Sequence, residues 1–168
     1  RSIAMVFQHF SLFPALSVLE NIAIALEPEK GQKGEGLDAL RARIMAESQR
    51  RGLDINPDRP VGRLSVGEKQ RVEILRCLLQ NPRLLIMDEP TSVLTPQEID
   101  QLFVVLRQLA ADGCAILYIS HKLNEVITLA DTATVLRGGR NVGSTTPKQS
   151  STRALAEMMV GGGIDHVR

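Results

Sequence analysis

The chain has 168 residues, 43% of them hydrophobic and 23% charged, which suits one domain or most of one. Its 20 Lys and Arg and its 19 Asp and Glu are interspersed and leave a net charge of +1, so no basic stripe indicates a nucleic-acid-binding protein. Four Phe, one Tyr and no Trp argue against a base-stacking surface, and no apolar run reaches the roughly 18 residues of a membrane-spanning helix.

Helical and strand-like segments alternate along the chain. Short apolar runs predict buried strands, and longer periodic segments that end near Gly or Pro predict helices. In chain order they are a strand at 3–7, helices at 17–26, 37–51 and about 67–80, a strand at 84–87, a helix from 96 to 113, a strand at 115–119, a helix at 122–129, a hairpin of strands at 132–136 and 141–144, and a helix at 151–160. Strands separated by helices of this length predict a parallel α/β sheet.

Four polar residues directly follow predicted strands. They are Gln8, Asp88, Glu89 and His121. Ligands of parallel α/β sheets bind at the carboxyl ends of the strands. We therefore expect these side chains to gather along one edge of the sheet and to share a site.

The Asp88-Glu89 pair supplies the first candidate chemistry. Mg²⁺ prefers carboxylate and water oxygens, and the end of a buried strand fixes the position of Asp88. Glu89 is next along the chain and can polarise an attacking water, as phosphoryl transfer requires. A solvated Asp-Glu turn is the alternative, but the apolar run before the pair and Pro90-Thr91 after it favour a functional site.

The segment at 64–68 (L-S-V-G-E) opens a predicted helix. Free backbone N–H groups and the helix dipole at such an end favour a phosphate. Gly67 permits a close approach, and the Ser65 hydroxyl adds a donor. Ser65 alone could be an ordinary helix cap, but the acidic pair downstream favours a phosphate contact.

His121 and Gln8 are weaker candidates when each is considered alone. A histidine between a strand and a helix can bridge a γ-phosphate and a catalytic carboxylate, although a lone histidine is more often structural. The Gln8 amide could contact Mg²⁺ or the attacking water. No G-x-x-x-x-G-K-[ST] loop occurs in the 168 residues to hold the phosphates of a bound nucleotide.

Together these residues resemble the nucleotide-binding domain of an ABC (ATP-binding cassette) ATPase. Five motifs occur in the order and at the spacing of that family. They are Val6-Phe7-Gln8 for the Q-loop, Leu64-Ser65-Val66-Gly67-Glu68 for the LSGGQ signature, 84–89 for Walker B with its catalytic glutamate, 92–95 for the D-loop, and His121 for the H-loop. Phrases such as R-V-E-I-L and T-S-V-L-T-P-Q-E resemble the branch of simple-sugar and nucleoside importers, the nucleoside type more closely.

The resemblance implies a fold and a set of partners. The fold would be a P-loop NTPase-like parallel sheet, with a helical subdomain at about 10–64 that docks on the transmembrane permease. The domain would run from 1 to 161, and 162–168 would begin a linker to a second cassette in the same chain. A solute-binding protein would take part indirectly, no nucleic acid would be bound, and the protein would lie at the cytoplasmic face of the cell membrane.

The resemblance also implies residue roles toward ATP and Mg²⁺. Gln8 would sense Mg²⁺ and the membrane subunit, and Asp88 would support Mg²⁺ through water. Glu89 would be the general base, and His121 would contact the γ-phosphate. The signature segment, Ser65 and Gly67 above all, would clamp ATP held by a facing cassette.

Three departures from the family pattern stand out. Val66 and Glu68 replace the usual glycine and glutamine of the signature, while Ser65 and Gly67 remain. Thr95 stands where the D-loop usually has aspartate, which could weaken one tie between the facing sites. The P-loop, its strand and the N-terminal antiparallel strands of the family are missing, which predicts unpaired strand edges at 115–119 and 132–136 and a tendency to aggregate.

The sequence thus predicts a piece of an ATP-hydrolysing subunit that powers import of a nucleoside or simple sugar, itself inactive without the Walker A loop. The chain does not begin with Met, which fits a piece of a longer protein. Two alternatives remain open. One is a non-transport ABC ATPase of ribosomes or DNA, and the other is a non-catalytic remnant of a truncated gene.

Overall fold

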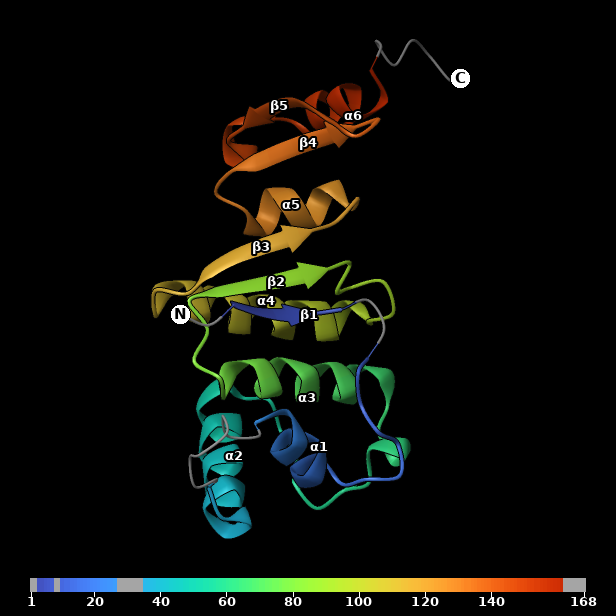
Figure 1. Cartoon of the computed structure of the whole chain (residues 1–168). Helices are drawn as coiled ribbons and strands as arrows, with labels where there is room; N and C mark the ends of the chain where they lie inside the picture. The colour runs from blue at the N-terminus through green and yellow to red at the C-terminus, as the bar shows by residue number, and fades with distance from the viewer. Residues whose placement is uncertain (1–2, 8–9, 27–34, 162–168) are drawn as a thin grey trace. The chain divides into compact units, whose positions relative to one another are not determined.

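The computed structural model describes residues 3–7, 10–26 and 35–161 (Figure 1). The elements are, in chain order, β1 (Ile3–Val6), α1 (Val18–Ala25), α2 (Leu37–Arg51), η1 (Val61–Arg63), α3 (Val66–Leu78), β2 (Leu84–Asp88), α4 (Pro96–Ala111), β3 (Ala115–Ile119), α5 (Leu123–Leu129), β4 (Ala133–Arg137), β5 (Arg140–Thr145), η2 (Pro147–Gln149) and α6 (Thr152–Val160). They form two compact units, Arg1–Ile119 and Ser120–Arg168, and each is described here by itself. The domain limits inferred from the resemblance stay a prediction, since the linker at 162–168 lies outside the described residues.

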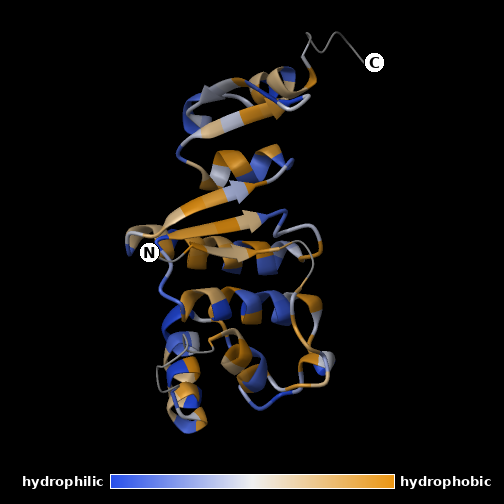
Figure 2. Ribbon diagram, in the orientation of Figure 1, coloured by the Kyte–Doolittle hydropathy of each residue, from blue (hydrophilic) through white to orange (hydrophobic). Residues whose placement is uncertain are grey.

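The first unit is built on a parallel sheet with the strand order β1-β2-β3. In its register, Ile3 lies beside Leu84, and Leu84 lies beside Ala115. On one face of the sheet the side chains of β1 and β2 are packed and at most 5% exposed: Ala4, Val6, Leu85 and Met87. The predicted parallel α/β architecture is therefore confirmed, and the strands carry the strongest hydrophobic colouring of this unit in Figure 2.

Helices cover the packed face of this sheet. Helix α3 packs on β1 and α4 packs on β3, where the rings of Phe103 and Tyr118 meet edge to face at 6.2 Å. Helices α1 and α2 pack against α3, so α3 lies between them and the sheet (Figure 1). Because α3 lies between the sheet and these two helices, its apolar side chains are almost fully buried. Val72, Ile74 and Leu75 are at most 2% exposed.

Three of the helices described in the first unit, α1, α3 and α4, begin with the same capping pattern. Ser17, Ser65 and Thr95 each cap a helix through the side-chain oxygen, and each donates its backbone N–H to the carboxylate of a glutamate three residues later. Because Ser65 is the cap, α3 begins at Val66 rather than at residue 67 as predicted. Strand β2 also runs one residue further than predicted, since Asp88 pairs with Ile119.

Strand β3 is the edge of this sheet within the part of the chain that the structure describes. It pairs with β2 on one side, and β4 pairs instead with β5. The unpaired edge predicted at 115–119 is thus present. Leu117 and Ile119 on this strand are 51% and 44% exposed, so the edge is also apolar.

The second unit contains the predicted hairpin. Strands β4 and β5 are antiparallel around Gly138-Gly139, where φ is 56° and 74°, values that glycine adopts without strain. Helix α6 packs on the hairpin and buries Leu155, while α5 packs on α6. Among the helices of the described ranges, none combines the length and the apolar character needed to cross a bilayer.

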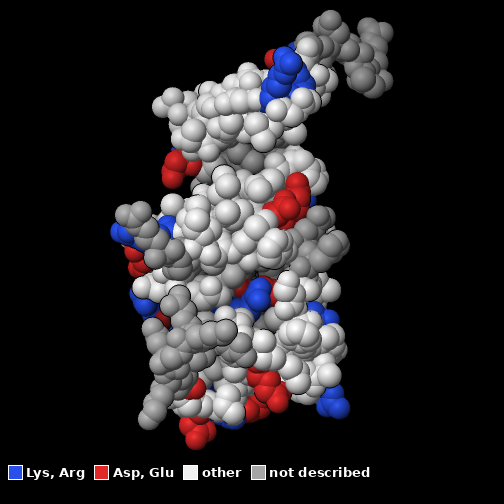
Figure 3. Space-filling model, in the orientation of Figure 1, with Lys and Arg blue, Asp and Glu red and all other residues white. Residues whose placement is uncertain are grey.

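Charged side chains are spread thinly over the surface. Figure 3 shows Lys and Arg near Asp and Glu, with uncharged areas between them, on the face that is visible. Many of the charges pair locally, as Arg41 does with Asp58 and Arg153 with Glu157. Such exposed pairs contribute little to stability, typically about 0–1 kcal/mol each.

Candidate functional site

Asp88 and Glu89 lie at the carboxyl end of the central strand. Asp88 is the last residue of β2, and both side chains are partly buried. β1 ends level with this point, because Val6 pairs with Met87. A carboxylate at this end of a parallel sheet is in the position where α/β folds bind their ligands.

The backbone turns sharply at Glu89. Its φ is 46°, in the left-handed region that residues other than Gly, Asn and Asp seldom occupy. The Glu89 N–H donates to the carbonyl of Ile119 at 2.9 Å, which extends the β2–β3 ladder by one bond. Strain of this kind persists where the surroundings over-determine it, and it clusters at functional sites.

Two buried residues fix the chain after this turn. Thr91 is fully buried, and the Gln70 side-chain amide donates to the carbonyl of Pro90. Gln70 belongs to α3, so the segment after the acidic pair is tied directly to the helix that follows the signature segment. The sequence reasoning missed Gln70, because an amide in mid-helix gives no local signal of its partner.

The start of α3 is a closed capping box. The Ser65 Oγ accepts the N–H of Glu68 at 3.2 Å, and the Glu68 Oε2 accepts the N–H of Ser65 at 2.6 Å. Ser65 and Val66 are exposed, whereas Leu64 is buried. The hydroxyl therefore faces solvent at a helix N-terminus, as a phosphate contact requires, while it also caps the helix.

Gly67 is buried by a carboxylate from another helix. A Cβ built at Gly67 would lie 1.8 Å from Glu98 Oε1 and 2.4 Å from Glu98 Cδ. Glu98 is held in place by Thr95, whose N–H donates to Glu98 Oε2 at 2.9 Å. The absence of a side chain at Gly67 thus lets α4 approach α3 closely, a packing reason that the sequence did not indicate.

Arg59 joins the turn before α3 to its first residues. One of its nitrogens pairs with Glu68 Oε1, and Nη2 donates to the carbonyl of Arg63 at 3.0 Å. The hydrogen bond from the Ser65 N–H, more than the nearby Arg59 charge, lowers the pKa of the Glu68 carboxyl against the opposing effect of partial burial. Glu68 is consequently charged at neutral pH.

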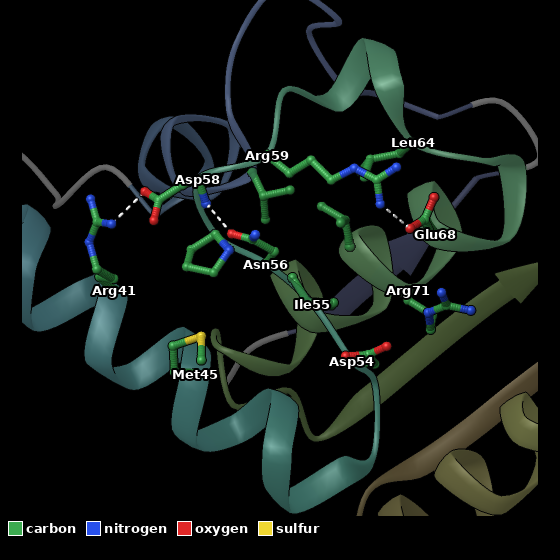
Figure 4. Close-up of a pocket in the computed structure, with 13 residues that line it drawn as sticks. Arg41, Met45, Asp54, Ile55, Asn56, Asp58, Arg59, Leu64, Glu68 and Arg71 are labelled. Carbon is green, nitrogen blue, oxygen red and sulfur yellow. Dashed lines mark hydrogen bonds and ion pairs between the residues drawn. The ribbon is translucent and has the colours of Figure 1, made fainter.

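A groove of about 570 Å³ adjoins this turn. Figure 4 shows Arg59 and Glu68 on one wall and Arg41 with Met45 from α2 on the other. The connector at 54–59 crosses between them. The groove is open and lined by charges of both signs, unlike the deep apolar pocket of a small-molecule site.

The structure tests neither His121 nor Gln8 as a neighbour of the acidic pair. His121 is exposed and belongs to the second unit, between Ser120 and Lys122. Gln8 lies outside the described residues. The predicted gathering of Gln8, His121 and the acidic pair therefore stays a prediction.

Thr95 takes a structural role at the position that differs from the D-loop pattern. Its Oγ1 accepts the N–H of Glu98 at 3.4 Å and donates to Glu98 Oε2 at 3.0 Å, capping α4 just before Pro96. Threonine and aspartate both cap helices well. The substitution thus preserves the start of α4.

Comparison with known proteins decides the family. The model of the family described as ABC transporter matches residues 1–92, more than half of the chain and the part that holds the signature segment and the acidic pair. The chain belongs to the ABC transporter family. The predicted membership of the ABC family is therefore confirmed.

Individual ABC family members are similar over nearly the whole chain. A ribose import ATP-binding protein of Rubrobacter xylanophilus is 42% identical over 166 residues, covering 95% of this chain. A nucleoside import ATP-binding protein of Lactococcus lactis is 40% identical over 165 residues, covering 98%. In both cases the chain spans 32% of the relative, about a third of its length.

The fold is also that of a solved ABC cassette. The cassette MJ0796, determined as a dimer bound to ADP and Pi, matches with a TM-score of 0.71 and 25% identity. The match covers 86% of this chain and 62% of the cassette. This likeness confirms the predicted ABC ATPase fold class.

Proposed function

We propose that this chain is part of the ATP-hydrolysing subunit of an ABC importer that takes up a nucleoside or simple sugar. The observation that carries the proposal is the Asp88-Glu89 pair at the end of the central strand, in a chain matched by the ABC family. Import proteins for ribose and for nucleosides are among its relatives. The names of these relatives favour a small polar solute. Sequence segments such as R-V-E-I-L and T-S-V-L-T-P-Q-E favour a nucleoside over a simple sugar.

Asp88 fits a supporting role toward Mg²⁺, whereas the phosphates of ATP require a Walker A loop, which the 168 residues do not contain. No cluster of three or more potential metal ligands occurs among the described residues, and Mg²⁺ is typically held by one or two carboxylates with water and substrate phosphates. Asp88 would support the ion through water. Bound Mg²⁺ would neutralise charge on the phosphates, as in other phosphoryl-transfer enzymes.

The proposed roles of this chain's residues follow from their match to the motifs of the family. Glu89 acts as the general base and orients the attacking water, and His121 contacts the γ-phosphate. Gln8 senses the metal and the permease. Ser65 and Gly67 clamp ATP that a facing cassette holds, either in the same chain or in a second subunit, as the dimeric state of the solved cassette supports.

The remaining partners are proposed from the relatives. The helical region from about Phe10 to Arg51 docks on permease subunits, which places the subunit at the cytoplasmic face of the membrane. A solute-binding protein delivers the solute. If the protein purifies together with a permease, rather than with ribosomes or DNA, the importer hypothesis is favoured over a non-transport ABC ATPase.

The first prediction concerns ATP turnover. The protein, produced with whatever sequence flanks residues 1–168 in its gene, is expected to hydrolyse MgATP. Glu89→Gln is expected to lower kcat about 100-fold or more, because it removes the base. The 168 residues alone are expected to show no turnover, since they contain no Walker A loop.

A phosphate-release assay measures ATP turnover by the protein with its flanking sequence, by its Glu89→Gln variant and by the 168 residues alone. Glu157→Gln is the control, since that glutamate is 37% exposed and pairs with Arg153 in α6. Turnover that survives Glu89→Gln would contradict the role of Glu89. Absence of turnover from the protein with its flanking sequence would contradict the proposed activity and favour the remnant.

A further inference from the structure

Glu68 places a carboxylate where the family signature usually has a glutamine amide. Its side chain is 25% exposed and lies in the first turn of α3. Oε2 accepts the N–H of Ser65, and Oε1 pairs with Arg59. Both carboxylate oxygens thus have partners within the turn that carries the signature.

Arg59 is matched to a carboxylate at position 68. A glutamine there would turn either its carbonyl or its NH₂ toward the guanidinium, and it could not accept from Ser65 and Arg59 through two separate oxygens. The second bond of Arg59, to the carbonyl of Arg63, holds the guanidinium in the turn that immediately precedes α3. The pairing is therefore built into the local fold.

A phosphate that approaches this end of α3 meets more than one carboxylate. Besides Glu68, the carboxylate of Glu98 lies against Gly67 in the same turn. Carboxylates favour the helix N-terminus, but they repel a phosphate that binds there. A cation beside Glu68 offsets this repulsion.

We propose that Arg59 is a positioning residue for ATP, which neutralises Glu68 so that the signature end of α3 accepts a phosphate. The inference rests on the proposed function, because it concerns the same signature segment. Arg59 acts through Glu68 and does not itself touch the nucleotide. It compensates for the replacement of the signature glutamine by glutamate.

The second prediction tests this role in the protein produced with the sequence that flanks the chain in its gene. Arg59→Ala is expected to raise the KM for MgATP about 3- to 10-fold with kcat within about twofold, the size expected for a partly exposed ion pair. Glu68→Gln alone is expected to lower the KM, because it removes the carboxylate and leaves the cation. The double variant with Arg59→Ala and Glu68→Gln is expected to lose the increase in KM that Arg59→Ala causes alone.

Arg41→Ala is the matched control. Arg41 and Arg59 are 42% and 43% exposed, and each pairs with a carboxylate on the rim of the same groove. The Arg41–Asp58 pair lies away from the start of α3 (Figure 4). Its loss is expected to leave the KM unchanged, and circular dichroism verifies that every variant is folded.

The outcomes separate the two proposals. If the unaltered protein turns over ATP and Arg59→Ala has the same KM, the role of Arg59 is overturned while the proposed function stands. A raised KM that Glu68→Gln does not reverse would show that Arg59 only holds the Arg63 turn, and it would also overturn the role. If Arg59→Ala does not fold, Glu68→Gln is measured by itself. A KM for MgATP above that of the unaltered protein would then overturn the role of Arg59. No turnover at all overturns the proposed function.

Discussion

At the residue scale, Gly67 shows two demands on one position. In the proposed function Gly67 lies near the nucleotide, where a small residue is needed. The structure adds the Glu98 carboxylate, whose Oε1 lies 1.8 Å from the place of a Cβ at Gly67. Glu98 also helps to cap α4, because its Oε2 accepts hydrogen bonds from the N–H and the hydroxyl of Thr95. The start of the signature helix and the start of the helix after the acidic pair therefore constrain each other.

The third prediction follows from this contact. Alanine within a helix usually stabilises by about 0.5–1 kcal/mol relative to glycine, but Gly67→Ala must displace Glu98 from its cap. We expect Gly67→Ala to destabilise by about 1 kcal/mol, the typical contribution of a cap. In a Glu98→Ala background the same change is expected to be neutral or stabilising.

Chemical denaturation of the four proteins in this cycle gives the coupling energy. Asp100→Ala on α4 is the control background, since Asp100 is exposed and does not approach Gly67. Equal effects of Gly67→Ala with and without Glu98 would show that the contact does not constrain the two helices.

At the element scale, buried polar side chains hold the loop that links β1 to α1. Asn21 is 4% exposed, and its amide accepts the N–H of Phe13 at 2.7 Å and donates to the carbonyl of Ser17 at 2.9 Å. Glu73, 1% exposed on α3, accepts the N–H of Ser11 at 2.9 Å. Helices α1 and α3 thus fix the segment that begins just after Gln8, which is the segment that couples to the permease in the proposed function.

The fourth prediction concerns this loop. Asn21→Ala removes the side-chain acceptor of the part-buried Phe13 N–H, and we expect it to destabilise the protein by about 1–2 kcal/mol. Hydrogen exchange of residues 11–17 should accelerate as well. Asn56→Ala, which removes one exposed bond to the N–H of Asp58, is the control and should cost about 0.5 kcal/mol or less. A matching effect of the two variants would contradict the role of Asn21.

At the scale of the whole molecule, the sheet of the first unit ends in an apolar edge. β3 has no second strand beside it among the described residues, and Leu117 on it is 51% exposed. Ile3, on the opposite edge strand, is 67% exposed. Open, apolar strand edges favour pairing between molecules.

The fifth prediction is that the 168-residue chain self-associates through β3. Sedimentation velocity over a range of protein concentrations should show mass above the monomer, and Leu117→Lys should shift it toward monomer because a charge blocks edge pairing. Val104→Lys on α4 is the matched control, since Val104 is also 51% exposed. A chain that stays monomeric, or equal shifts from both variants, would contradict association through β3.

The sequence alone determined most of the architecture and the family. Apolar runs at 3–7, 84–87 and 115–119 predicted three strands, and the alternation with helices predicted that they are parallel. These features are local or periodic, so they can be read without knowing which segments meet. The signature segment and the acidic pair were found in the same way, because each lies within a few consecutive residues.

Only the tertiary structure decided how these motifs are supported. Glu98 against Gly67, Gln70 on Pro90 and Arg59 beside Glu68 join residues that are distant or unremarkable in sequence. No local pattern specifies such partners, because a side chain's partner depends on how helices pack. The left-handed backbone at Glu89 was equally hidden, since it is imposed by the end of the β2–β3 ladder rather than by the preference of a glutamate residue.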